Sequence, residues 1–384
     1  MEWLNPPGRF GIIRMYFLRK AKGEVSMGKR IGILTSGGDC PGLNAVIRGV
    51  AKASYHLMPD IEIIGIQDGY RGLIHGEYKT MKKSDFSGIL TLGGTILGTS
   101  RQPFKLMRVI GEDNVDKVKN MKANYKAMKL DCLLILGGNG THKTAALLAE
   151  EGLNVIGLPK TIDNDLYGTD VTFGFHSALD IATDCIDKIH TTATSHGRVM
   201  VVELMGNKSG WLTLNAGVAG GADAILLPEI PYDLQKVAKV MDQRAEKGKA
   251  FSIIAVAEGA MDLQEAKMKR KERLAARKAA GYSSVGAKLA AELEQLTGNE
   301  TRLVLPGHIQ RGGSPSAYDR VLSTQFGAYA ARLIQQNVYG VGVAMVDGVV
   351  THHPLKDIAG KSKLVQPDDP LVLCAKDLGI AFGD

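Results

Sequence analysis

The chain has 384 residues, of which 45% are hydrophobic, and a formal net charge of +7. This length and composition allow a large core and favour two lobes over one, and the lack of any run of about 18 apolar residues excludes an ordinary membrane-spanning helix. Residues 1–30 hold seven basic and two acidic side chains, so the rest of the chain is nearly neutral, which argues against a nucleic-acid surface.

The amino-terminal segment and the cysteines bear on where the protein works. The first 28 residues are basic but lack both the long apolar stretch and the small-residue cleavage site of a signal peptide, so we expect a flexible extension. The four cysteines are scattered and form no Cys-x-x-Cys pair. We therefore expect reduced thiols in a cytoplasmic protein, and not a disulfide or zinc framework.

Strand and helix patterns alternate along the body of the chain. The strand pattern RIGILT at 30–35 runs into a glycine turn and a helix, and IEIIGIQD at 61–68 completes a βαβ unit. Further strands are expected at 131–136, 154–158, 198–204, 224–227 and 251–257, and helices at 142–150, 176–194 and 212–220. This alternation predicts an α/β protein with mainly parallel sheets that are covered by helices.

The length fits two lobes with the active site between them. We expect residues 29–170 to form the first lobe and residues 171–300 the second, with a return segment at about 300–384 that packs on either lobe. Residues 261–297 are rich in Lys, Arg, Glu and Ala. This composition indicates a solvated helical segment, broken at Gly281.

Three glycine turns carry the first chemical signal: TSGGDCPGLNAVIRG at 35–49, LGGTILGTSR at 92–101 and GGNGTHKTA at 137–145. Backbone N–H groups in such turns, and the N-terminus of a following helix, suit a phosphate group. Arg101 at the end of the second turn can neutralise a transferring phosphoryl group. A single turn could be purely structural, whereas three favour a phosphate ligand.

The stretch PKTIDND at 159–165 places two carboxylates two residues apart. Asp163 can accept the proton of a substrate hydroxyl while a phosphoryl group is transferred. Asp165 would then hold a magnesium ion through water or orient Asp163. The structural alternative is a turn rich in Asp and Asn.

The stretch PGHIQRGGSP at 306–315 sets His308 and Arg311 beside two glycines, and Arg302 precedes His308 by six residues. Two arginines and a histidine can clamp an anionic group of a substrate. A lone histidine would more often be an ordinary surface residue, but this cluster favours binding.

The ordered set of motifs resembles the phosphofructokinases. From about Lys29 to about Tyr329 the chain contains, in the family's order, TSGGDCPGLNAVIRG, GGTILGTSR, GGNGTHKTA, PKTIDND, MGNKSGW, AEGA and GHIQRGGSPSAYDR. The resemblance implies two Rossmann-like lobes, the first for a phosphoryl donor and the second for a sugar phosphate. It also implies Mg²⁺, a homo-oligomer (a tetramer or dimer), and phosphorylation of the 1-hydroxyl of fructose 6-phosphate in glycolysis.

The resemblance also assigns roles to residues. Asp163 would be the general base, assisted by Thr161 and Arg101, and Asp165 would hold magnesium through water. The donor would be bound by Gly37, Gly38, Arg101, Gln102, Gly138, Asn139, Gly140 and Thr141. The sugar phosphate would be bound by Thr161, Ile162, Asp163, Arg198, Met205, Gly206, Asn207, Glu258, Arg302, His308, Ile309, Gln310 and Arg311. In the family the arginines that match Arg198 and Arg302 come from a neighbouring subunit, which would make assembly a condition of activity.

Two positions bear on the choice of donor. Glycine at 140 leaves room for the α-phosphate and nucleoside of ATP, whereas family members with aspartate there are left with pyrophosphate. Lys160, in contrast, is typical of the pyrophosphate-dependent members. Steric exclusion is harder to overcome than an added cation, so we favour ATP and keep a pyrophosphate-dependent reversible enzyme as the alternative.

Asn139 and Asn207 depart from the family pattern. An acid that binds Mg²⁺ usually stands at position 139; asparagine keeps an oxygen ligand but loses a charge. Many relatives have arginine at position 207, and Lys208 is a candidate to replace its contact.

Two other readings compete with a sugar-phosphate kinase. NAD kinases and lipid kinases share a similar glycine turn, but they lack the GHIQRGGSP and MGNKSGW stretches. A non-catalytic regulatory protein that binds sugar phosphates would usually lose the base, whereas Asp163 and Asp165 are both present here.

Overall fold

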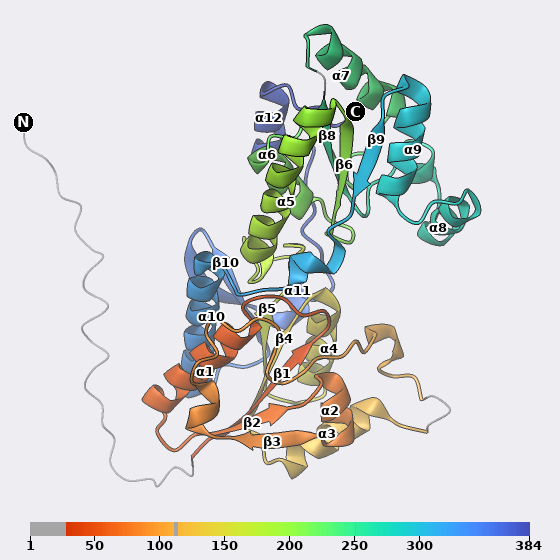
Figure 1. Ribbon diagram of the computed structural model, residues 1–384. Helices are drawn as coiled ribbons and strands as arrows, with labels where there is room; N and C mark the ends of the chain where they lie inside the picture. Colours follow the sequence, from red (N-terminus) through yellow and green to blue (C-terminus); the bar gives the residue numbers. More distant parts are fainter. Residues whose placement is uncertain (1–27, 111–113, 250) are drawn as a thin grey trace, which may run out of the picture.

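The computed structural model describes residues 28–110, 114–249 and 251–384, so the amino-terminal extension expected at 1–28 lies, but for its last residue, outside the described residues. The chain forms two lobes, each built on its own sheet (Figure 1). The larger sheet has the strand order β11-β10-β5-β4-β1-β2-β3, and the smaller has the order β7-β8-β6-β9. No helix in the described ranges is long and apolar enough to cross a membrane.

The large sheet is parallel except at its two edges. Its strands are β1 (Arg30–Ser36), β2 (Glu62–Ile66), β3 (Tyr78–Met81), β4 (Cys132–Gly137), β5 (Val155–Pro159), β10 (Val341–Val346) and β11 (Val349–Pro354). Only the edge strands β3 and β11 pair antiparallel. The register sets Ser36 opposite Gly137 and Gly137 opposite Pro159, so three central strands end at one level. The turns that follow these strands are therefore neighbours.

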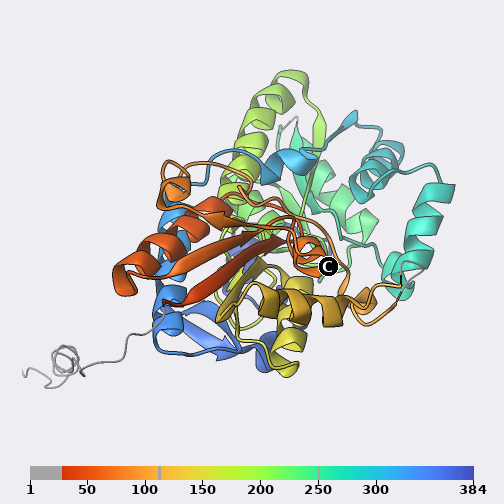
Figure 2. The same ribbon diagram turned by 90° about the horizontal axis from the view of Figure 1, so that it is seen from below.

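Alternating side chains of the large sheet fill two layers. Ile31 and Ile33 of β1 face one core with helices α1 (Leu43–Leu57) and α10 (Ala317–Gln335). Leu34 faces the other core, with α2 (Tyr70–His75), α3 (Lys117–Ala127) and α4 (Asn139–Glu150). Figure 2 shows the strands of this sheet between the two helical layers. This period of two is what a strand buried on both faces requires.

The small sheet is wholly parallel. It contains β6 (Val199–Leu204), β7 (Ala224–Leu226), β8 (Ser252–Ala257) and β9 (Thr301–Val304). Helices α5 (Phe175–His196) and α6 (Trp211–Ala219) cover one face, and α7 (Leu234–Glu246) and α9 (Val285–Thr297) cover the other. Since α5 shares its core cluster with α1 and α10, one continuous apolar core joins the lobes.

The carboxyl-terminal part of the chain divides between the lobes. Helix α10, strands β10 and β11 and helix α11 (Leu355–Ile358) belong to the large lobe, whereas α12 (Pro370–Asp377) returns to pack on α6. Short 3₁₀ helices η1 (Lys83–Phe86), η2 (Phe104–Leu106), η3 (Glu265–Lys267) and η4 (Gly307–Arg311) complete the described elements.

The α/β class with mainly parallel sheets is confirmed, and the predicted strands lie within two residues of those observed. The charged segment does break at Gly281, which has a φ of 85° between α8 (Arg270–Ala279) and α9. The expectation of a solvated face was wrong in part, because Arg277 is buried and Lys288 is largely covered. The four cysteines are free thiols.

Candidate active site

A cleft of about 600 Å³ opens where the two lobes meet. It collects side chains from both sheets and from two of the three glycine turns, together with Arg101 at the end of the third. Its lining consists of Ser36, Gly37, Gly38, Arg101, Gln102, Pro103, Phe104, Gly138, Asn139, Gly140, Thr141, Lys160, Thr161, Asp163, Asp165, Met205, Asn207, Glu258, His308 and Arg311. Seventeen residues of this lining are among the predicted site residues, Lys160 among them for donor selectivity; Ser36, Pro103 and Phe104 are additions.

The wall on the large lobe consists of glycine turns at strand ends. The turns after β1 and before Arg101 are tied together, because Gly37 N–H donates to Ser100 O at 3.1 Å and Thr99 Oγ1 donates to Gly37 O at 2.7 Å. Helix α4 begins directly after Gly138 and carries no acidic residue in its first turn. Its free N–H groups and positive dipole end therefore face the cleft, where an anion would be stabilised.

Two glycines of this wall differ in what surrounds them. A Cβ on Gly38 would lie 2.8 Å from Nη1 of Arg311, so the guanidinium from the η4 segment packs directly on the turn. A Cβ on Gly140 would meet no atom of the described residues within 4 Å. The fold itself does not require glycine at 140, and the space beside it is open to a ligand.

The loop PKTIDND presents its two carboxylates to the cleft. Asn164 turns the other way: its φ is 50°, its Oδ1 accepts the N–H of Thr172 at 3.1 Å, and its Nδ2 donates to Asp170 O at 3.3 Å. Asparagine is among the few non-glycine residues that readily adopt this left-handed conformation. The amide of Asn164 thus anchors the loop while Asp163 and Asp165 line the cavity.

Asp163 has the environment of a base. Burial, together with the nearby carboxylates of Asp165 and Glu258, raises its pKa to about 6. Its Oδ1 is buried and has no hydrogen-bond partner within the described part of the chain. The backbone around it is fixed, since its N–H donates to Thr161 Oγ1 at 3.0 Å and its carbonyl accepts from Ser209 Oγ at 3.3 Å. A buried, unpartnered carboxylate of raised pKa is typical of a general base.

Lys160 is buried beneath the donor wall. Its Nζ donates to Gly38 O, and burial lowers its pKa. The ammonium therefore holds the first glycine turn in place through this hydrogen bond, and its other N–H groups remain for a ligand or water.

The carboxamide of Asn139 is engaged with the carboxyl-terminal segment. Oδ1 accepts the N–H of Gly360 at 2.8 Å, while Nδ2 donates to Lys361 O at 3.0 Å and to Ser362 Oγ at 3.2 Å. The same segment continues to Lys363, whose N–H donates to Asp165 O at 2.8 Å. Asn139 thus holds residues 360–363, which we call the strap, beside Asp165. An aspartate could still accept from Gly360, but it could not donate to Lys361 O.

The sugar-side wall comes from residues 205–208, which we call the substrate loop, and from η4. Asn207 has a φ of 55°, a left-handed conformation that asparagine adopts more readily than most residues. Glu258 holds the loop by accepting the N–H groups of Gly206 at 3.2 Å and Asn207 at 2.7 Å. Gln310 is fully buried and its Oε1 accepts the N–H of Met205 at 3.2 Å, so it supports the loop from below.

Several predicted substrate residues lie outside the cleft. Ile162 is buried in the core, Ile309 is 70% exposed, and Gly206 and Gln310 stand behind the lining. Arg198 and Arg302 lie at the opposite end of the small sheet, near the starts of β6 and β9, where both pair with Glu300. Their guanidinium groups cannot reach the cleft of their own chain.

Parallel strands, glycine turns at their carboxyl ends and a buried carboxylate between two lobes define an α/β protein that binds phosphate groups. The chain belongs to the phosphofructokinase family, whose model, described as Phosphofructokinase, matches residues 30–334. An ATP-dependent 6-phosphofructokinase of Spirochaeta thermophila is 55% identical over 93% of this chain and 98% of its own length. One of Propionibacterium freudenreichii subsp. shermanii is 46% identical over 93% of this chain and its own full length.

Solved structures of phosphofructokinases have the same fold. That of Pichia pastoris in the T-state is 31% identical with a TM-score of 0.75, and the match covers 88% of this chain but 36% of that longer chain. The pyrophosphate-dependent enzyme of Nitrosospira multiformis has a TM-score of 0.76 over 93% of both chains. At 20% identity it supports the fold alone.

Proposed function

We propose that this protein phosphorylates the 1-hydroxyl of fructose 6-phosphate, with ATP as donor, to give fructose 1,6-bisphosphate. The observation that carries the proposal is the carboxylate of Asp163, which lies between the glycine turns and the substrate loop in one cleft. Relatives that are 46–55% identical over 93% of the chain are named ATP-dependent 6-phosphofructokinases, which supports the same reaction.

Asp163 acts as the general base. With a pKa of about 6 it is mostly ionised at neutral pH, yet it is a stronger base than an ordinary aspartate. It accepts the proton of the 1-hydroxyl as that oxygen bonds to the γ-phosphorus and the bond to the leaving ADP breaks. The charge of the transferring group is received by Arg101, by the N–H groups of the turn at 37–38 and by the start of helix α4.

Magnesium fits this site as an ion carried by the donor phosphates. The described residues bring together no group of three or more His, Cys, Asp or Glu side chains that could hold a metal alone. Asp165 lines the cleft and can bind the ion through water. Oδ1 of Asn139 already accepts one hydrogen bond, so it offers at most one further lone pair. Bound magnesium would neutralise phosphate charge, and the chain's own residues would orient the reactants.

The open space at Gly140 supports ATP over pyrophosphate, since no atom of the described chain lies within 4 Å of where a side chain at 140 would begin, and the nucleoside end of the donor needs this room. Lys160 is compatible with either donor, because its ammonium donates one hydrogen bond to Gly38 O and keeps N–H groups for a phosphate oxygen.

His308 and Arg311 bind the sugar phosphate from the same chain, and Arg198 and Arg302 serve a neighbouring subunit's cleft. The second part rests on their place at the far end of the small sheet. It requires a homo-oligomer, a tetramer or a dimer, as the active form.

A direct test replaces Asp163 with serine and measures fructose 1,6-bisphosphate formation. We expect kcat to fall by about 10²–10⁴-fold with little change in fructose 6-phosphate affinity, since a general base acts in the transition state. Turnover close to that of the unchanged protein would contradict the assignment.

A further inference from the structure

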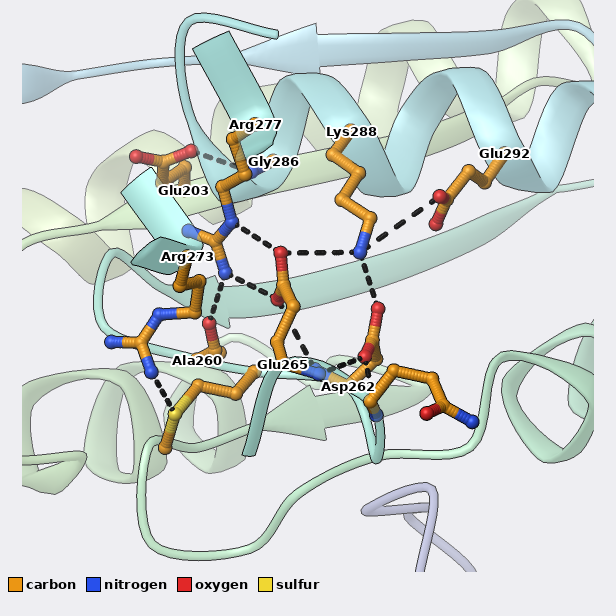
Figure 3. Close-up of polar contacts among 11 residues, drawn as sticks. Glu203, Ala260, Asp262, Glu265, Arg273, Arg277, Gly286, Lys288 and Glu292 are labelled. Carbon is orange, nitrogen blue, oxygen red and sulfur yellow. Dashed lines mark hydrogen bonds and ion pairs between the residues drawn. The ribbon is translucent and has the colours of Figure 1, made fainter. Parts of the chain in front are cut away.

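Two lysines outside the cleft each hold several segments of the chain together, and they differ in what they hold. Lys288 of α9 pairs with Asp262 and lies 3.2 Å from Glu265 (Figure 3). Arg277 of α8 completes this ion-pair network, because its Nε and Nη2 each donate at 2.6 Å to one oxygen of Glu265. This network fastens α8 and α9 within the small lobe. Lys363 of the strap, in contrast, reaches the loop of the two cleft carboxylates.

The ammonium of Lys363 is bound to the main chain of that loop. Its Nζ donates to Thr169 O at 2.9 Å and to Asp170 O at 2.7 Å. Asp170 O also accepts from Nδ2 of Asn164 at 3.3 Å, which is the amide that anchors the loop. One carbonyl oxygen therefore joins the lysine to the residue that stands between the two cleft carboxylates. Hydrogen bonds from a charged donor are stronger than those between neutral groups, so the lysine is a firm anchor.

The main chain of Lys363 makes two further contacts, one with each lobe. Its N–H donates to Asp165 O at 2.8 Å, and its carbonyl oxygen accepts from Nε1 of Trp211 in α6 at 3.1 Å. The ammonium lies 5.4 Å from the centroid of the same indole ring, within the range of a cation–π contact. Asn139, at the start of α4, holds the strap at Lys361. The strap thus connects the donor wall, the carboxylate loop and the small lobe.

We propose that Lys363 is a positioning residue for the phosphoryl transfer. It holds residues 163–170 against the strap and α6, so that the carboxylate of Asp163 faces the substrate hydroxyl. Lys363 stands behind the cleft lining and acts on the reactants through this loop. The inference rests on the proposed function, since it concerns the geometry of the base in that reaction. An error of about 1 Å in the position of a reacting group can cost about 10²-fold in rate.

Four variants of the full chain test this role. Lys363→Met removes the charge and the N–H donors but keeps a long side chain beside Trp211. Lys363→Arg restores donors and charge. Lys361→Met removes the same charge from the same strap, where the ammonium lies 5.3 Å from the ring of the exposed Tyr167. Lys288→Met breaks the network of Figure 3 and is the control for a general loss of stability.

Steady-state kinetics and urea unfolding of all four variants give the first result. We expect Lys363→Met to lower kcat about 10–100-fold while each KM changes by less than about threefold. Lys363→Arg should recover most of this loss, because a guanidinium can donate to both carbonyl oxygens. Lys288→Met should unfold at lower urea, since it leaves buried carboxylates unpaired, yet keep its kcat, as should Lys361→Met. Equal kcat values for Lys363→Met and Lys361→Met would overturn the proposal, as would an equal fall in Lys288→Met.

Hydrogen exchange of the loop, followed by mass spectrometry, tests the same contacts without catalysis. The amides of Asp163, Asp170 and Thr172 are hydrogen-bonded within or beside this loop. We expect them to exchange faster in Lys363→Met than in Lys361→Met, because the loop loses its anchor. Equal exchange in the two variants would overturn the proposal. An unchanged chain that forms no product would refute the proposed function, whereas the exchange result decides by itself whether Lys363 orders the loop.

Discussion

Replacing Asp163 with asparagine should abolish turnover and at the same time stabilise the protein. Its pKa is raised from an ordinary value of 3.8 to about 6, chiefly by burial, so the folded protein disfavours the charged form. Below pH about 4 the carboxyl is protonated in both the folded and the unfolded chain, so burial of its charge costs no folding free energy. The cost develops as pH rises from about 4 to 6 and is complete above about 6. The shift of about two units corresponds to about 3 kcal/mol.

The assay is urea unfolding of the unchanged chain and of Asp163→Asn at pH 5 and pH 7.5, with the same samples assayed for phosphoryl transfer. We expect the variant to be up to about 3 kcal/mol more stable at pH 7.5 and to gain less at pH 5. Asp187→Asn, which removes an exposed carboxyl from α5, is the control and should change neither property. An asparagine variant that is no more stable at pH 7.5 would refute the reasoning that burial raises this pKa.

Three further predictions concern the donor, the strap and the subunit contact. Gly140→Asp should abolish turnover with ATP and spare any turnover with pyrophosphate, because its carboxylate would occupy the space for the α-phosphate and nucleoside, whereas its Cβ meets no atom of the described chain within 4 Å; retained ATP activity in a steady-state assay would sink the steric argument. Asn139→Asp should lower the free energy of unfolding by about 1–3 kcal/mol, because its side chain faces Lys361 O without a donor; an unchanged urea midpoint would show that the strap does not depend on this amide. Arg302→Ala should raise the KM for fructose 6-phosphate while leaving the KM for ATP unchanged; equal effects on both would argue against a role in a neighbour's sugar site.

Much of the fold and of the cleft could be predicted because the signals are local. Each buried parallel strand is an apolar run that ends at a glycine or a polar turn, so β1, β4 and β5 were located within two residues. The sheet register then brings the turns after these strands together. Asp163 and Asp165 could be predicted as site residues for the same reason, because they lie in the turn that follows the carboxyl end of β5.

What the sequence could not provide depends on contacts between distant residues. The amide of Asn139 meets residues more than 200 positions away, and no local pattern indicates that partner. Arg277 lies in a run of basic residues typical of a solvated face, yet its side chain is buried in an ion pair with Glu265. One omitted signal was local: an asparagine directly after Gly206 is a candidate for positive φ, which is the conformation that Asn207 adopts.

The central claim is phosphoryl transfer from ATP to fructose 6-phosphate in the cleft that Asp163 lines. The most direct test incubates the purified chain with fructose 6-phosphate and Mg²⁺ and assays fructose 1,6-bisphosphate with ATP and, separately, with pyrophosphate. The account predicts product with ATP and little or none with pyrophosphate. Product with pyrophosphate alone would contradict the choice of donor, and no product with either would contradict the proposed reaction itself.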